Sequence, residues 1–254
     1  APTNINHFDG YIQGASTLTK YKSHEIVPDL NQGGWHDAGD DDLRVESQIG
    51  TVWNLALMLE EFNIESYDAT SIDYDKKIVE IHQPDGKSDA LQQMEHGLAS
   101  ILAGYRSMGR LYRGIITNSL KQYVLLGDFG GVTDGIWNPN PSAKDDDRWV
   151  FTEDNPDREL NVAAGLAASY RVLKAKNPKL ATECLETAKA LYKTSFVKSK
   201  RADSKITLLV ELALATNEAI YTNEIVNLQA EVLKNFENLG WKVGRMKHLI
   251  NDKS

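Results

Sequence analysis

Apolar residues recur at helical spacing along most of this chain, and this periodicity does most to limit the folds available to it. Between residues 42 and 62, and again in a segment after residue 87, apolar positions lie three or four residues apart: Ile49, Val52, Trp53, Ala56 and Leu59, then Leu91, Met94, Leu98, Ile101, Leu102 and Tyr105. This spacing places the apolar side chains on one face of an α-helix. The sequence therefore predicts two amphipathic helices in its first half.

The second half of the chain is predicted to be almost wholly helical. Two Asn-Pro pairs, at 155–156 and 177–178, each place an N-cap residue before a proline at the first helical position. Helical spacing of apolar residues follows, and it returns over 206–215 and 225–239. Short turns separate these segments, so neighbouring helices are expected to form antiparallel hairpins.

No segment shows the clean alternation of apolar and polar residues that is typical of a half-buried β-strand. Residues 63–87 are polar and are expected to form a loop. Residues 127–155 are rich in glycine and proline and contain Trp137 and Trp149. A loop of this length within a compact domain is usually functional. The sequence thus predicts an all-α fold with elaborate loops.

Size and charge narrow the classes of function. The chain has 254 residues and a formal net charge of -8, which argues against a nucleic-acid groove or an anionic membrane surface. No apolar run approaches the roughly 20 residues that span a bilayer. Cys184 is the single cysteine, so an internal disulfide is excluded. No signal-peptide pattern follows Ala1, as expected of a cytosolic protein, a processed secreted one or an excised segment.

A run of acidic and glycine residues is the strongest candidate for a functional site. It reads Gly33-Gly34-Trp35-His36-Asp37-Ala38-Gly39-Asp40-Asp41-Asp42, and residues 37–42, called the acidic turn below, hold four carboxylates. The first predicted helix follows directly. We expect Asp41 or Asp42 to be its N-cap, because a short carboxylate can accept hydrogen bonds from the first helical amides.

Asp37 and Asp40 are close enough in the chain for both carboxylates to face one cleft. Such a pair can orient a water molecule and take its proton as it attacks an electrophilic carbon. An inverting glycosidase uses this arrangement on one side of the sugar, with a carboxylic acid opposite. Trp35, Trp137 and Trp149 offer flat apolar surfaces suited to stacking on pyranose rings.

Other interpretations of the acidic turn remain open from spacing alone. It could be a solvated loop that caps a helix, or it could bind calcium through its oxygen ligands. An EF-hand is not the explanation, because Asp42 and Gln48 occupy the places of its glycine and glutamate when Asp37 is the first position. A non-catalytic helical module that binds carbohydrate or calcium is the alternative function.

Three stretches together resemble glycoside hydrolase family 9, the inverting cellulases and related β-glucanases, in the form common among Bacteroidota. They are the run 33–40 quoted above, the segment 89–97 (DALQQMEHG), and 146–155 (DDRWVFTEDN) with 159–167 (ELNVAAGLA). The resemblance covers about residues 30–195, and the first signature is specific. It implies an (α/α)6 barrel with an open cleft formed by loops at one end.

The resemblance also implies an activity and a set of site residues. The activity is endo-acting hydrolysis, with inversion, of a β-1,4-glucan such as cellulose, mixed-linkage glucan or a xyloglucan backbone. Asp40 matches the general base, and Asp37 its partner in holding the water. Trp35, His36, Trp137 and Trp149 are the residues expected to contact the substrate. The family often has tyrosine at the position of His36.

One member of the family's catalytic set has no counterpart in the sequence. The family's general acid is a glutamate near the C-terminal end of the catalytic domain, whereas the late glutamates here fit the exposed faces of helices: Glu211, Glu218, Glu224, Glu231 and Glu237. We therefore expect residues 1–254 to be the N-terminal portion of one (α/α)6 domain, with the remainder outside this chain as its partner. The resemblance requires no cofactor, is compatible with a structural calcium ion, and implies a secreted, periplasmic or cell-surface location.

Overall fold

The computed structural model of the chain falls into two compact units. One comprises residues 1–51 and 95–154, and the other comprises 52–94 and 155–254. The structure describes residues 5–7, 19–22, 25–36, 42–62, 64–73, 75–76, 78–117, 148–234, 236–240 and 244–251.

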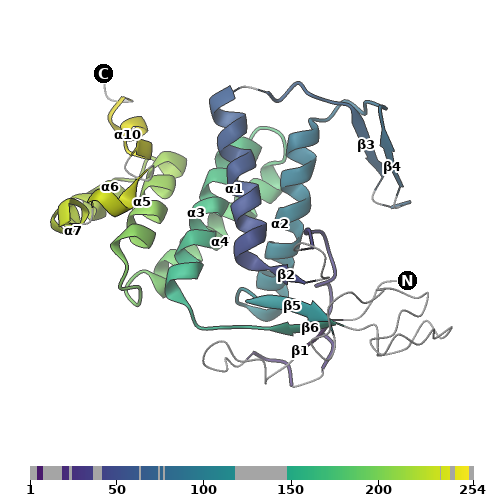
Figure 1. Cartoon of the computed structure of the whole chain (residues 1–254), viewed down its shortest axis with the longest axis horizontal. Helices are drawn as coiled ribbons and strands as arrows, with labels where there is room; N and C mark the ends of the chain where they lie inside the picture. Colours follow the sequence, from purple (N-terminus) through teal and green to yellow (C-terminus); the bar gives the residue numbers. More distant parts are fainter. Residues whose placement is uncertain are drawn as a thin grey trace. The chain divides into compact units, whose positions relative to one another are not determined.

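The first unit contains a four-stranded sheet (Figure 1). Its strands are β1 (Ile5–His7), β2 (Leu43–Arg44), β5 (Gly114–Thr117) and β6 (Arg148–Phe151), in the order β1-β6-β5-β2. β1 runs parallel to β6, and the other neighbours are antiparallel. Leu43, Ile115 and Val150 lie opposite one another across three strands, and all are buried. Each of these strands is too short to show the alternation of apolar and polar residues in the sequence, and the chain is predominantly helical as predicted.

The two predicted helices of the first half are present as α1 (Val45–Phe62) and α2 (Asp89–Met108). Most of each apolar stripe is buried as predicted: Ile49, Val52, Ala56 and Leu59 on α1, and Leu91, Met94, Leu98, Ile101 and Leu102 on α2. Trp53 and Tyr105, predicted for the same stripes, are only half-buried. The predicted cap at Asp42 was wrong. Strand β2 lies between Asp42 and the start of α1, and the Asp42 carboxylate pairs instead with Arg44.

The segment 63–87, expected to be a loop, contains a hairpin of β3 (Thr70–Asp73) and β4 (Ile78–Ile81) in the second unit. Every residue of β4 is exposed, so no buried face marks the strand in the sequence. Hydrogen bonds from backbone amides to two aspartate carboxylates connect the ends of the hairpin to the start of α2. Asp89 accepts hydrogen bonds from the amides of Ala69 and Thr70, and Asp68 accepts from the amide of Gly86.

Three longer helices form the body of the second unit: α3 (Pro156–Leu173), α4 (Pro178–Ser195) and α5 (Ala202–Thr216). The predicted caps are confirmed, because the Asn155 side chain accepts from the amide of Arg158 and the Asn177 side chain from that of Leu180. Helix α3 contacts both α4 and α5. It is buried on nearly all sides, as expected of a helix with small apolar residues around its circumference.

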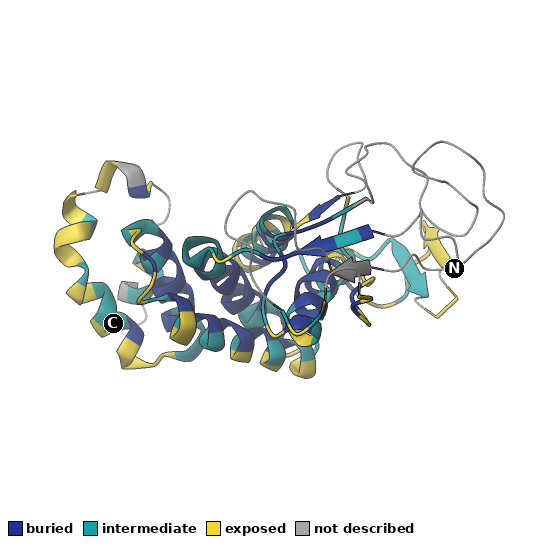
Figure 2. Cartoon of the chain, turned by 90° about the horizontal axis from the view of Figure 1, so that it is seen from below, coloured by how far each residue is buried: buried dark blue, intermediate teal, exposed yellow. Residues whose placement is uncertain are grey.

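The helix predicted over 225–239 is divided. It corresponds to the end of α6 (Ala219–Asn227), α7 (Gln229–Lys234) and α8 (Phe236–Leu239), and α10 (Lys247–Asn251) follows. Leu239 packs with Ile206 and Val210 of α5 in a small core. Much of this C-terminal part is exposed, as the yellow segments near the C-terminus in Figure 2 show. Among the helices of the described ranges, none has the length and apolar content to cross a membrane.

Candidate functional site

Two glycines bring the segment before the acidic turn into direct contact with helix α2. Gly33 and Gly34 have φ values of +57° and +82°, in the left-handed region that favours glycine. A Cβ atom on Gly33 would lie 2.1 Å from the carbonyl oxygen of His96, and one on Gly34 would lie 3.0 Å from Cβ of Ser100. Both conformation and space therefore require glycine at Gly33.

His96 holds this glycine pair through two hydrogen bonds. The amide of Gly34 donates to the His96 carbonyl oxygen at 2.9 Å. The His96 ring nitrogen Nε2 lies 2.8 Å from the Gly34 carbonyl oxygen, which can only accept, so Nε2 of His96 carries a proton. The second resembling stretch, 89–97, thus contributes the helix surface on which the first stretch docks.

Gln48 of α1 fixes the backbone of Trp35 from a second side. The Trp35 amide donates to Gln48 Oε1 at 2.8 Å, and Gln48 Nε2 donates to the Trp35 carbonyl oxygen at 2.7 Å. Gln48 is 1% exposed, so this two-way pairing is shielded from water. The half-buried Trp35 ring lies 5.7 Å from the His96 ring, at an angle of 58°. Periodicity gave no sign of this role for Gln48.

His36 contacts a buried arginine from the third resembling stretch. Arg148, the first residue of β6, is 5% exposed. Its Nη1 lies 3.3 Å from Nε2 of the exposed His36, and its Nη2 donates to Oδ1 of Asn31 at 2.7 Å. The structure therefore joins residues 31–36 to the sheet immediately before the acidic turn.

A buried tyrosine lies beneath this segment. The Tyr112 hydroxyl is 2.8 Å from Ser100 Oγ, and Ser100 is also the residue against which Gly34 packs. Burial raises the pKa of Tyr112 well above its usual value, although the hydrogen bond with Ser100 opposes that shift. Tyr112 therefore remains a neutral phenol and supports the glycine segment by packing and hydrogen bonding.

The remaining predicted site residues are placed only in part. Trp149 follows Arg148 in β6, and successive side chains of a strand point to opposite faces of its sheet. Trp149 and Arg148 therefore lie on opposite faces. Asp37, Asp40 and Trp137 lie outside the described residues, so their roles stay predictions.

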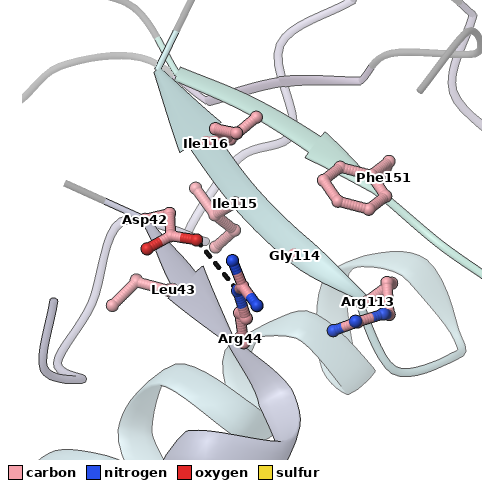
Figure 3. A pocket seen from close by; sticks show the side chains of 8 residues that line it. All are labelled: Asp42, Leu43, Arg44, Arg113, Gly114, Ile115, Ile116 and Phe151. Atoms are coloured by element: carbon pink, nitrogen blue, oxygen red, sulfur yellow. Dashed lines mark hydrogen bonds and ion pairs between the residues drawn. The ribbon is translucent and has the colours of Figure 1, made fainter. Parts of the chain in front are cut away.

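A small pocket adjoins the C-terminal end of the acidic turn (Figure 3). It has a volume of about 30 Å³ and is lined by Asp42, Leu43, Arg44, Arg113, Gly114, Ile115, Ile116 and Phe151. Arg44 Nε lies 3.0 Å from Asp42 Oδ2, and Arg113 pairs with Glu46 and with Glu153. The space suits a water molecule and is far too small for a pyranose ring.

One glutamate predicted to be exposed is buried. Glu211 of α5 is 1% exposed, and its carboxylate pairs with Arg171 at 2.7 Å and with Arg245 at 3.0 Å. Glu60 joins both arginines. Burial lowers the pKa of Arg171, but the bonds with Glu60 and the charge of Glu211 outweigh it and raise that pKa. The predicted exposure of Glu211 was wrong, because an isolated helix pattern cannot reveal arginines from other segments.

The chain was compared with protein families, with curated sequences and with solved structures. The sequence profile of Glycosyl hydrolase family 9 matches residues 7–243. No curated protein sequence matches the chain significantly. Several solved structures share the fold. A metagenome-derived family 9 endoglucanase has a TM-score of 0.61 and 20% identity, with 89% of this chain and 40% of that chain covered.

Two further structures give the same result. A Bacteroides ovatus protein described as GH9 has a TM-score of 0.59 and 16% identity, covering 89% of this chain and 41% of its own. A thermostable endoglucanase from Alicyclobacillus acidocaldarius has a TM-score of 0.57 and 16% identity, covering 79% and 37%. The chain thus spans about two fifths of their length, and the predicted fold class is confirmed. The family match extends over nearly the whole sequence, so this chain belongs to glycosyl hydrolase family 9.

Proposed function

We propose that this chain supplies the water-activating side of an inverting endo-β-1,4-glucanase. The match to glycosyl hydrolase family 9 over residues 7–243 is the observation that carries the proposal. Cellulose, mixed-linkage glucan and xyloglucan share the backbone that such an enzyme cleaves. Because these polymers lie outside the cell that degrades them, we also propose that the protein is exported to the periplasm or cell surface.

In the proposed reaction, Asp37 and Asp40 hold a water molecule, and Asp40 takes its proton. The water oxygen bonds to the anomeric carbon as the glycosidic bond breaks, and a carboxylic acid protonates the departing oxygen. That acid is proposed to be a glutamate outside residues 1–254. In an inverting enzyme the two carboxyl groups lie about 6.5–9.5 Å apart, which leaves room for the water.

The hydrogen bonds that hold residues 33–36, directly before the acidic turn, support this proposal. Residues 33–36 are hydrogen-bonded to α1 through Gln48, to α2 through His96 and to β6 through Arg148. A general base must hold its water in a narrow range of geometry to be effective. Three attachments in the four residues before Asp37 are suited to that task.

The partner of this chain is proposed to be the remainder of the same catalytic domain. The chain covers only 40% of the length of the metagenome-derived endoglucanase. Its C-terminal helices expose large apolar side chains: Ile220 at 52%, Val226 at 66%, Leu233 at 66% and Phe236 at 56%. Surfaces of this kind are typical of helices that pack against further structure.

The decisive experiment is product analysis with the complete protein on a panel of β-glucans. We expect hydrolysis of a soluble β-1,4-glucan, with the α-anomer released first, as detected by NMR immediately after cleavage. Asp40→Asn should reduce the rate by about 10²–10⁴-fold while oligosaccharide binding survives.

Asp73→Asn is the matched control, because Asp73 lies on the exposed hairpin and pairs only with nearby Lys76 among the contacts described. That variant should retain the parental rate. Unchanged turnover in Asp40→Asn, or release of the β-anomer, would overturn the proposed mechanism.

A further inference from the structure

The arginine that contacts His36 is unusual in being both buried and charged. Arg148 is 5% exposed, and its guanidinium reaches two residues of the segment before the acidic turn, Asn31 at 2.7 Å and His36 at 3.3 Å. An arginine stays protonated at any ordinary pH, and its planar fork can hold two partners at once. One side chain therefore fixes two points of that segment.

The contact also determines the state of the His36 ring. A guanidinium has five N–H donors and no acceptor, so Nε2 of His36 must accept the bond from Arg148. A protonated imidazole has no free lone pair and would place a second cation beside the first. His36 is therefore neutral, with its proton on Nδ1. The Gly34 carbonyl imposes the opposite arrangement on His96, which carries its proton on Nε2.

We propose that Arg148 is a positioning residue for the segment that leads into the acidic turn: it anchors Asn31 and His36 to the sheet and selects the Nδ1–H form of the His36 ring. The inference rests on the proposed function, because His36 directly precedes Asp37 in the chain. Holding His36 at a fixed point limits the positions open to the residues that follow it in the chain. A general base must keep its water within a narrow range of geometry to be effective.

The first test measures which nitrogen of the His36 ring carries the proton, and it does not require enzymatic activity. Nitrogen-15 NMR of the histidine side chains distinguishes Nδ1–H from Nε2–H imidazole. In the wild-type protein at pH 7.5 we expect Nδ1–H at His36 and Nε2–H at His96. In Arg148→Met, His36 should shift toward the Nε2–H form, while His96 serves as an internal control and stays unchanged.

The wild-type spectrum remains decisive even if Arg148→Met does not fold. A proton on Nε2 of His36 in the folded wild type, or a cationic ring at pH 7.5, would overturn the proposal. If the complete enzyme hydrolyses no β-glucan, the proposed function fails, but this spectrum still tests the role of Arg148. The two failures are therefore distinguishable.

The second test uses the kinetics of the complete enzyme. Arg148→Met should lower kcat by about 10²-fold, the scale expected when a catalytic group is displaced by about 1 Å, with KM changed less than about threefold. Arg148→Lys keeps the positive charge but loses the planar guanidinium that contacts two partners at once. Its kcat should therefore be only slightly higher than that of Arg148→Met. A loss confined to KM, or full recovery with lysine, would contradict a positioning role based on two partners.

Discussion

At the scale of single residues, the glycine pair shows how a motif can be required for a purely geometric reason. Gly33 has a positive φ, and its Cα faces the backbone of α2 at a distance that no side chain can occupy. The neighbouring Trp35 is then held by the Gln48 amide on both its N–H and its carbonyl. The geometry of the segment before Asp37 therefore depends on two residue types that have no chemical reactivity of their own.

Gly33→Ala should be strongly destabilising. The added methyl group meets the His96 carbonyl oxygen, and the positive φ adds strain of about 1–3 kcal/mol. Gly109→Ala is the matched control, since its φ is +71° and no atom lies within 4 Å of the position of its Cβ. Urea unfolding should give a larger loss for Gly33→Ala, and equal losses would refute the steric explanation.

Gln48→Glu should destabilise the protein by about 1–3 kcal/mol at pH 7, because an ionised carboxylate cannot donate to the Trp35 carbonyl. Burial and that carbonyl both raise the pKa of the new carboxyl in the folded state. A raised folded-state pKa means that the lost stability returns as the pH falls and the group is protonated.

Denaturant titrations at pH 7 and pH 4.5, each referred to wild type, measure this difference. Gln32→Glu is the control, because Gln32 is exposed and its side chain bonds only to the Asp29 carbonyl oxygen among the described contacts. A deficit for Gln48→Glu that is the same at both pH values would contradict the proposed pairing.

At the scale of helices, an ion network centred on the buried Glu211 joins segments of the second unit. Glu60 of α1, Arg171 of α3, Glu211 of α5 and Arg245 of the C-terminal segment form it. Glu211 is bound to two guanidinium groups in the interior, so both of its carboxylate oxygens are engaged in ion pairs. Glu211 is therefore a structural residue.

Glu211→Gln should lower the free energy of unfolding by about 1–3 kcal/mol, because it removes the fully buried carboxylate from two arginines that keep Glu60 as a partner. Asp203→Asn removes a carboxylate from the more exposed pair with Arg201 and should cost no more than about 1 kcal/mol. Urea unfolding of both variants and of the wild type measures the two losses in free energy of unfolding. A Glu211→Gln loss no larger than that of the control would show that the network contributes little.

Cys184 of α4 offers a probe of the same helices. The thiol is fully buried, and burial raises its pKa well above the usual value, so almost no thiolate is present at neutral pH. Thiolate is the reactive form. We expect a thiol reagent to modify Cys184 only as fast as the helices open, with reaction accelerating across the urea transition. Rapid modification of the folded protein would contradict the burial of α4.

At the scale of the whole molecule, the short span of the chain relative to matched structures has a functional consequence. Because the proposed acid is outside residues 1–254, this chain alone should bind β-glucan oligosaccharides without cleaving them. A protein that also carries the proposed acid should do both. Parallel binding and reducing-sugar assays on the two proteins test this expectation, and cleavage by the chain alone would place the proton donor within it.

The sequence determined the features that depend on local order along the chain. The apolar stripes of α1 and α2 and the caps at Asn155 and Asn177 were predicted correctly, because spacing and capping act within a few residues. The family was likewise recognised from its signature in the sequence, whereas the role of the acidic turn stays a prediction.

Only the tertiary structure decided which distant residues meet. His36 and Arg148 are 112 positions apart, and Arg245 reaches Glu211 across 34. Such contacts depend on how whole helices and strands pack, which no local period records. For the same reason, the sequence showed a pair of glycines beside an acidic turn, whereas the folded chain explains why those glycines are needed.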